Sequence, residues 1–182
     1  MGRAKFQQLQ KLGIAVAALS AAFAAGPACA KAAQGDAEIT IVRPLSFVID
    51  DNLDFGSIIP GTVAGTVTMT PTGTRTATNG IVIIGGGHKP ASFAGMGVFN
   101  QRVDVSLGAN SIFITGPGTR MRVGTFVVGS TPTAVLTTTP MRFRIAAANG
   151  IFYFPVGATL EVGARQAPGF YSGTWSITLN YF

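Results

Sequence analysis

The sequence predicts an all-β protein built as a sandwich of antiparallel sheets, and three observations carry this prediction. Thr, Val, Ile, Phe and Gly are abundant, whereas Lys, Glu and Gln, the usual residues of solvated helix faces, are scarce. Short runs alternate between apolar and polar residues, as strands with one buried face do. Turn-forming residues separate these runs at intervals that fit roughly eight strands in two packed sheets.

The first 30 residues have the pattern of a signal peptide. Arg3, Lys5 and Lys11 precede a run of small and aliphatic residues from Leu12 to Ala25. This run is about fourteen residues long, too short for a membrane-spanning helix, which needs roughly twenty. The small residues 28–30 favour cleavage after residue 30.

A lipid anchor on Cys29 is the alternative interpretation of this terminus. The residues before it, Gly26-Pro27-Ala28, lack the Leu-type residue of a lipobox, so we expect cleavage without an anchor. Removing the three basic residues of the signal leaves ten Lys and Arg against seven Asp and Glu, a net charge of about +3. The single cysteine is also removed, so we expect no disulfide in the mature chain.

The expected strands begin directly after the signal and recur along the chain. Their alternating apolar residues are Ala37, Ile39 and Ile41; Val63, Val67 and Met69; Val103, Val105 and Leu107; and Met121, Val123 and Val127. The expected turns between strands include Pro60-Gly61, Pro71-Thr72-Gly73, Asn79-Gly80, Gly85-Gly86-Gly87, Gly116-Pro117-Gly118 and Asn149-Gly150. We expect one domain without internal repeats.

Residues 169–182 give the clearest strand pattern of the sequence. The apolar side of the alternation consists of Tyr171, Gly173, Trp175, Ile177, Leu179 and Tyr181, and the other side of Ser, Thr and Asn. A strand with this pattern presents one continuous apolar row, which must be buried.

This segment resembles the carboxyl-terminal strand of chaperone-usher pilins, which has alternating apolar residues, a penultimate tyrosine and a glycine fourteenth from the end. Tyr181 and Gly169 occupy those two positions. Residues 43–58, 87–97 and 156–160 resemble an uncharacterised family of secreted Gram-negative proteins, itself similar to spore-coat-type archaic pilins. The resemblance implies an incomplete immunoglobulin-like sandwich, completed first by a periplasmic chaperone and later by the amino-terminal strand of another subunit.

The resemblance divides the chain into a signal peptide (1–30), an extension with a candidate donor strand (31–43) and a sandwich domain (44–182). The expected donor residues are Ala37, Ile39 and Ile41. The expected acceptor edge, which would also bind the chaperone, consists of Gly169, Tyr171, Trp175, Ile177, Leu179 and Tyr181. The implied partners are copies of itself or related subunits, the periplasmic chaperone and an outer-membrane usher, with the fibre at the cell surface.

Two features depart from the pilin pattern and keep an alternative open. Many pilins have a disulfide that this chain lacks, and Pro44 interrupts backbone donation just after the three apolar donor residues. In the alternative, residues 37–42 pair with their own sheet. The protein would then be a complete, secreted monomer that binds a glycan or matrix partner.

Catalytic and metal sites have little support in the sequence. His88 is the only histidine, and the mature chain has no cysteine, so neither a hydrolytic triad nor a zinc site can be assembled. Asp50, Asn52 and Asp54 have the initial spacing of a calcium loop, but the glycine and glutamate that such a loop needs are absent. We therefore expect a non-enzymatic protein without cofactor or metal. The remaining hypothesis about function is an enzyme whose active site the sequence does not reveal.

Two further groups of residues suggest surface roles. Arg120, Arg122, Arg142 and Arg144 lie at alternate positions, which favours solvent-facing charge on strands, with contact to an anionic surface polysaccharide as the alternative. The modest net charge argues against nucleic acid as a partner.

Phe152, Tyr153 and Phe154 are consecutive, so at least one should be exposed or covered by a neighbouring subunit.

Overall fold

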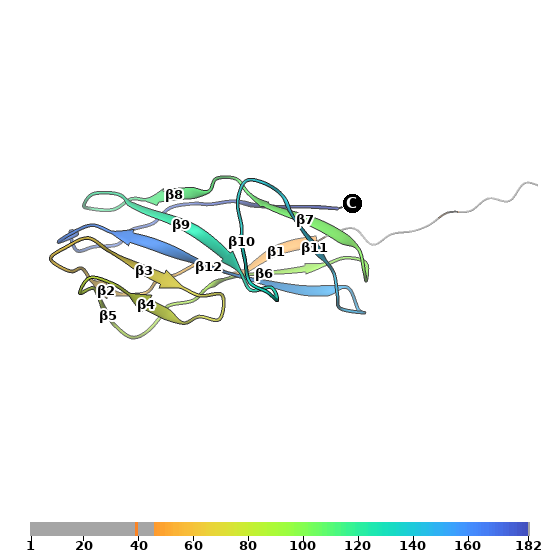
Figure 1. Cartoon of the computed structure of the whole chain (residues 1–182), viewed down its shortest axis with the longest axis horizontal. Coiled ribbons are helices and arrows are strands. Elements are labelled where there is room, and N and C mark those ends of the chain that lie inside the picture. Colours follow the sequence, from red (N-terminus) through yellow and green to blue (C-terminus); the bar gives the residue numbers. More distant parts are fainter. Residues whose placement is uncertain (1–38, 40–45, 182) are drawn as a thin grey trace, which may run out of the picture. The chain divides into compact units, whose positions relative to one another are not determined.

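The computed structural model describes Ile39 and residues 46–181, and these residues form β-strands and no helix (Figure 1). The strands are β1 (Ser46–Asp51), β2 (Ile58–Ile59), β3 (Gly65–Met69), β4 (Arg75–Ala77), β5 (Val82–Ile83), β6 (Ala91–Met96), β7 (Arg102–Leu107), β8 (Ser111–Ile114), β9 (Met121–Val128), β10 (Ala134–Val135), β11 (Met141–Arg144), β12 (Ile151–Val162) and β13 (Ile177–Tyr181). The all-β prediction is confirmed. No helix within these residues could cross a membrane.

The larger sheet is organised around the long strand β12. The first half of β12 pairs with β6, which in turn pairs with β1, and its second half pairs with β3, which pairs with β4. The opposite edge of β12 pairs with β9, which carries β8 and β10 on its far side. All of these pairings are antiparallel, as the sequence predicts.

A second sheet consists of three strands in the order β11-β7-β13. The last described strand therefore pairs with the middle of the chain rather than with its sequence neighbours. A small two-stranded sheet, β2 and β5, lies between β1 and β6 in the sequence. These arrangements give the sandwich-like architecture that the sequence predicts, consistent with an immunoglobulin-like fold.

The core contains the inward side chains of the two main sheets. Val67 and Met69 of β3, and Val103, Val105 and Leu107 of β7, are buried as their alternation predicts. The core cluster also includes the buried side chains of Phe93, Met121, Val123, Phe126, Val128, Leu136, Phe154, Val156, Leu160 and Val162. Val63 was expected in the same row as Val67, but it precedes β3 and is exposed.

The alternation of β9 changes phase in the middle of the strand. Phe126 and Val128 are buried, whereas Val127, which the sequence pattern placed in the core, is only partly buried. Thr125 has a φ of +47°, and the pairing between β9 and β12 shifts its register at the same level. This irregularity adds a residue to the repeat, so the prediction for Val127 was wrong.

Candidate functional site: an open groove between two strand edges

The C-terminal strand has the inward apolar face that the sequence predicts. Ile177 and Leu179 pack against the core, and these two residues and Tyr181 are each half-buried, while Thr178 and Asn180 are exposed. β13 pairs with β7 on one edge. Its other edge pairs with none of the described strands, so a row of half-buried apolar side chains lies beside an open strand edge.

The regular strand is shorter than the sequence pattern predicts, because pairing is irregular over residues 171–176. The partner strand β7 ends at Leu107, opposite Ile177, and the chain then turns into β8. A single bridge joins Ser172 to Thr115, and the N–H of Gly108 donates to the carbonyl of Ser176 at 3.0 Å. The segment is therefore held in place without a continuous ladder.

Trp175 joins this segment to the core through an aromatic row. Its ring stacks on Phe126 with 4.8 Å between centroids and meets Phe93 edge to face at 5.6 Å. Phe93 stacks in turn on Phe47 of β1, with 5.1 Å between centroids. The row therefore connects the C-terminal segment, the floor of the larger sheet and its first strand.

Tyr171 fixes the beginning of the segment through its hydroxyl group. The hydroxyl donates to the carbonyl of Ala167 and accepts from the N–H of Gly118 and from Gln166 Nε2, each at 2.9 Å. Its role is therefore partly structural, which the alternation alone did not indicate.

Gly169 lies against Pro117, where a Cβ would come within 2.5 Å of the proline Cγ, and its φ is +145°. Both conditions favour glycine.

Tyr181 differs from Tyr171 because its hydroxyl has no hydrogen-bond partner among the described residues, although the oxygen is buried. Burial also raises the pKa of this phenol, so the group is neutral at physiological pH. A buried hydroxyl without a hydrogen-bond partner is unfavourable.

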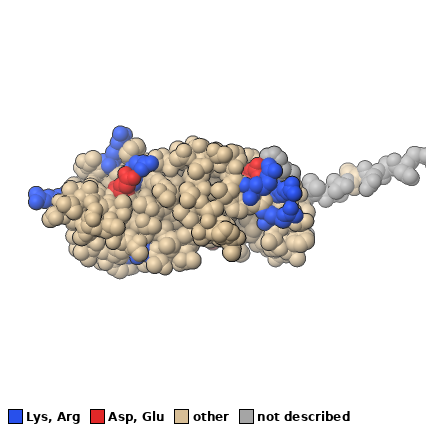
Figure 2. Space-filling model, in the orientation of Figure 1, with Lys and Arg blue, Asp and Glu red and all other residues tan. Residues whose placement is uncertain are grey.

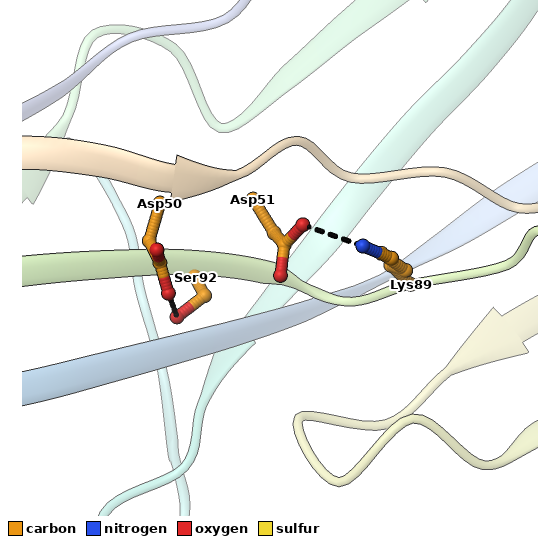
Figure 3. Close-up of polar contacts among 4 residues, drawn as sticks. All are labelled: Asp50, Asp51, Lys89 and Ser92. Carbon is orange, nitrogen blue, oxygen red and sulfur yellow. Dashed lines mark hydrogen bonds and ion pairs between the residues drawn. The ribbon is translucent and has the colours of Figure 1, made fainter.

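The opposite wall begins with β1, which pairs with β6 and with no second strand in the described part of the chain. Phe47 packs inward, whereas Val48 and Ile49 are exposed. The pairing with β6 shifts register between Ile49 and Asp51. This bulge lets Asp50 and Asp51 both reach towards β6, as Figure 3 shows.

Polar contacts hold the continuation of this wall, residues 51–58. Asp51 forms an ion pair of 2.9 Å with Lys89, and the Ser92 hydroxyl donates to Asp50 at 3.4 Å (Figure 3). The hydrogen bond from Lys89 to Asp51 raises the pKa of the lysine. Arg75 donates to the carbonyls of Phe55 and Ile84 and so ties the wall to the end of β5.

An open groove of about 910 Å³ lies between these two walls. One wall consists of Phe47, Ile49 and residues 51–58, and the other of residues 169–177. Its floor is apolar, with side chains of Ala91, Phe93, Ile112, Ile114, Met121, Val123 and Leu160. The unpaired edges of β1 and β13 meet this groove: Phe47 and Ile49 of β1 line it, and so does Ile177, the first residue of β13. Of the predicted acceptor residues, Leu179 and Tyr181 are not among those that line the groove. The site therefore offers an extended apolar segment both apolar contacts and free backbone edges.

The expected donor residues are only partly described. Ala37 and Ile41 lie outside the described residues, as does the predicted signal peptide. Ile39 belongs to no strand and is 83% exposed.

The carboxylates of the candidate calcium loop have other partners in the structure. Asp54 Oδ1 accepts the N–H of Gly56 at 2.7 Å, and Asp50 and Asp51 contact Ser92 and Lys89. His88 lies in a turn after Gly86 and Gly87, both of which have positive φ. Within the described residues, no group of three or more His, Cys, Asp or Glu side chains could hold a metal ion.

The four arginines do not form one cationic stripe, because β9 and β11 belong to different sheets. Each has a different neighbour: Arg120 lies over the ring of Phe113 at 4.1 Å, Arg122 pairs with Glu161 at 2.6 Å, Arg142 pairs with Asp104 at 2.8 Å, and Arg144 donates to Asn100 at 2.6 Å. On the face drawn in Figure 2, charged side chains gather in separate groups near the two ends, and the surface between them is uncharged.

The three consecutive aromatic residues point in different directions, as expected for a strand. Phe154 is buried in the core, Phe152 is half-buried, and Tyr153 is 71% exposed. The prediction that at least one of the three is exposed is therefore confirmed.

The sequence did not identify Phe47 and Phe93 as groove residues. It also did not identify Phe126, which stacks on Trp175, or Arg75, which holds the wall at residue 55. Phe93 could have been found from the alternation of Ala91, Phe93 and Gly95 in β6, which are all buried. No sequence pattern points to Arg75, because it contacts backbone carbonyls of loops that are distant in the sequence.

The family of the chain can now be stated from comparison with known proteins. The comparisons found no matching curated protein and no matching solved structure. One family model, described as a domain of unknown function (DUF4402), matches residues 45–181. The chain belongs to this family.

Proposed function

We propose that this member of the DUF4402 family is a structural, non-enzymatic subunit of a cell-surface fibre, assembled by donor-strand exchange. The observation that carries the proposal is the apolar groove between the unpaired edges of β1 and β13. The donor would be residues 31–42 of another copy or of a related subunit, with Ala37, Ile39 and Ile41 entering the groove.

The physical basis of the proposal is strand addition. An incoming extended segment makes ladder hydrogen bonds with a free strand edge, and its alternate side chains fill the apolar groove. Trp175, Ile177 and Leu179 are half-buried and already pack on the core, so a donor would complete their burial. Each isoleucine transferred from water contributes about 1.5–3 kcal/mol.

Charge favours a donor that runs antiparallel to β13. Asp36 and Glu38 flank the first donor residue, and Arg43 follows the last one. Arg102 and Arg144 lie in register beside the Tyr181 end of β13, and Asp51 and Asp54 line the opposite end of the groove. In the antiparallel orientation the acidic half of the donor meets the arginines, and Arg43 meets the carboxylates.

The proposal extends to the route of the protein. We expect export through the inner membrane by the signal peptide, a periplasmic chaperone that covers the groove in transit, and an outer-membrane usher. The chaperone would use the same edge, so a polar substitution at Trp175 or Leu179 should impair chaperone binding or folding.

The test compares residues 31–182 with residues 43–182, alone and with the peptide 31–42 added. We expect multimers that resist heating in detergent for the longer protein, and a large gain in thermal stability when the peptide is added to the shorter one. A stable monomer that is indifferent to the deletion would contradict the proposal. It would favour the alternative, a self-complete secreted module that binds a glycan or matrix partner.

A further inference from the structure

Two exposed apolar patches lie at opposite ends of β12, outside the groove. The β1–β6–β12 patch consists of Val48, Met96, Ile151 and Tyr153, all exposed. Strand register makes them neighbours, because Val48 and Tyr153 both pair with Ala94, and Met96 pairs with Ile151. This patch therefore lies at the beginning of β12.

The β2–β5 patch consists of Ile59, Val82 and Ile84, which are also exposed. Ile59 pairs directly with Val82 across the small sheet. Just after Ile59, the carbonyl of Gly61 accepts the N–H of Arg165, which follows the end of β12. A strand of this length spans about 40 Å, so the two patches are too far apart to cover one another within one copy.

The length of chain between donor and domain decides what covers these patches. Four residues lie between Ile41 and Ser46, and the five steps from Cα to Cα reach at most about 18 Å when fully extended. Ser46 pairs with Met96, so it lies at the edge of the β1–β6–β12 patch. A copy that holds Ile41 in its groove must therefore lie directly against this end of the donor copy.

The acceptor copy presents its β2–β5 patch at that point. In the antiparallel orientation, the donor leaves the groove at the end lined by Ile58 and Gly169. Ile58 is adjacent to Ile59, so the exit lies beside the β2–β5 patch. No member of either patch is charged. Because the side chains of both patches are apolar and exposed, burying the two patches against each other would be favourable.

We propose that successive copies in the fibre dock end to end, with the β1–β6–β12 patch of each copy packed on the β2–β5 patch of the copy that receives its donor strand. The inference rests on the proposed function. Because the two patches differ and lie at opposite ends, the contact is heterologous, which is the type of contact from which open fibres are built. The contact would fix the angle between copies that a flexible connection alone would leave free.

The test uses the mature chain, residues 31–182, which has no cysteine of its own. One variant carries Val82→Cys and Tyr153→Cys, one in each patch. The matched control carries Val135→Cys and Tyr153→Cys, since Val135 is exposed on β10 and belongs to neither patch. Each is treated with a short bis-maleimide and analysed after boiling, with an untreated, unboiled sample beside it.

We expect multimers that withstand detergent in both unboiled samples and that boiling dissociates. A ladder that survives boiling is expected only for the cross-linked pair that joins the two patches. Multimers in both samples with no ladder, or with equal ladders, would overturn the end-to-end contact and leave donor-strand exchange intact. An absence of multimers in the unboiled samples would overturn both proposals. The double variant Ile84→Ser and Tyr153→Ser should keep its multimers but give more flexible chains in small-angle scattering.

Discussion

At the scale of single residues, backbone geometry restricts one position with particular severity. Gly150 precedes β12 and has a φ of +75°, and a Cβ there would collide with the carbonyl of Gly97. A side chain would therefore meet both an unfavourable backbone conformation and an immovable neighbour.

We predict that Gly150→Ala lowers the free energy of unfolding by about 2 kcal/mol or more. The measurement is thermal or urea unfolding of residues 31–182. Gly85→Ala is the matched control, because no atom lies within 4 Å of its added Cβ. Equal effects of the two substitutions would contradict this account.

The pair of Asp104 and Arg142 gives a second prediction at this scale. Arg142 Nε and Nη2 donate to the two carboxylate oxygens at 2.8 and 3.0 Å, and these hydrogen bonds lower the pKa of Asp104. A pKa lowered by folding stabilises the protein above the unfolded pKa of about 4, and the contribution is lost as the pH falls through the folded value.

We therefore expect Asp104→Asn to lower the melting temperature at neutral pH and to have a smaller effect below a pH of about 3. Melting curves of both proteins across this range measure the difference. A gap that is constant with pH would show that the loss comes from packing and not from the charge.

At the scale of elements, the sequence predicted one wall of the groove better than the other. The C-terminal strand alternates regularly, so its inward residues, Ile177 and Leu179, could be assigned from period alone. The facing strand contains Phe47, Val48 and Ile49 in succession and then a bulge, so no period identified which of them faces inward. The prediction for Val127 was wrong for a similar reason, because the irregularity at Thr125 shifts the alternation of β9 by one residue.

The alternation of β13 predicts opposite effects of neighbouring substitutions. Ile177→Ser should weaken binding of the peptide 31–42 at least about tenfold, because a half-buried apolar contact at the groove is lost. Thr178→Ser, on the exposed face, should leave the affinity unchanged. Calorimetric titration of the peptide into residues 43–182 measures both, and a similar loss in the two variants would argue against the groove as the binding site.

Trp175, the single tryptophan of the chain, reports on the same element. We expect its fluorescence to shift to shorter wavelength and to become less accessible to acrylamide when the peptide is added, because the half-buried indole loses contact with water. A peptide with Ile39→Asp should produce neither change. Peptide binding without any change at Trp175 would place the peptide elsewhere.

At the scale of the whole molecule, the topology explains what sequence alone could not provide. Periodicity and turn residues predicted the sandwich, but the groove depends on which strands remain edges. That follows from pairings between distant segments, such as β1 with β6 and β13 with β7. The position of the arginines relative to the carboxylates of the groove depends on the same pairings.

The charge distribution along the groove predicts a compensating pair of substitutions. Arg43→Glu should reduce multimer formation a few-fold, since exposed ion pairs contribute at most about 1 kcal/mol. Asp54→Arg in the same chain should restore it. Both effects should disappear at high salt, where such charges are screened. No rescue at low salt would contradict the antiparallel orientation.

The pairing of β13 with β7 also determines when the groove comes into existence. Of the described strands, β13 is synthesised last, and its partner β7 precedes it by about seventy residues. Folding rates fall when contacts join residues far apart in sequence, because the intervening chain must first be ordered. Until β13 docks, β7 has only β11 beside it and its other edge is unpaired, so the growing chain passes through an aggregation-prone interval. Docking of β13 therefore completes the groove and also ends this interval. We expect it to be the slowest stage of folding.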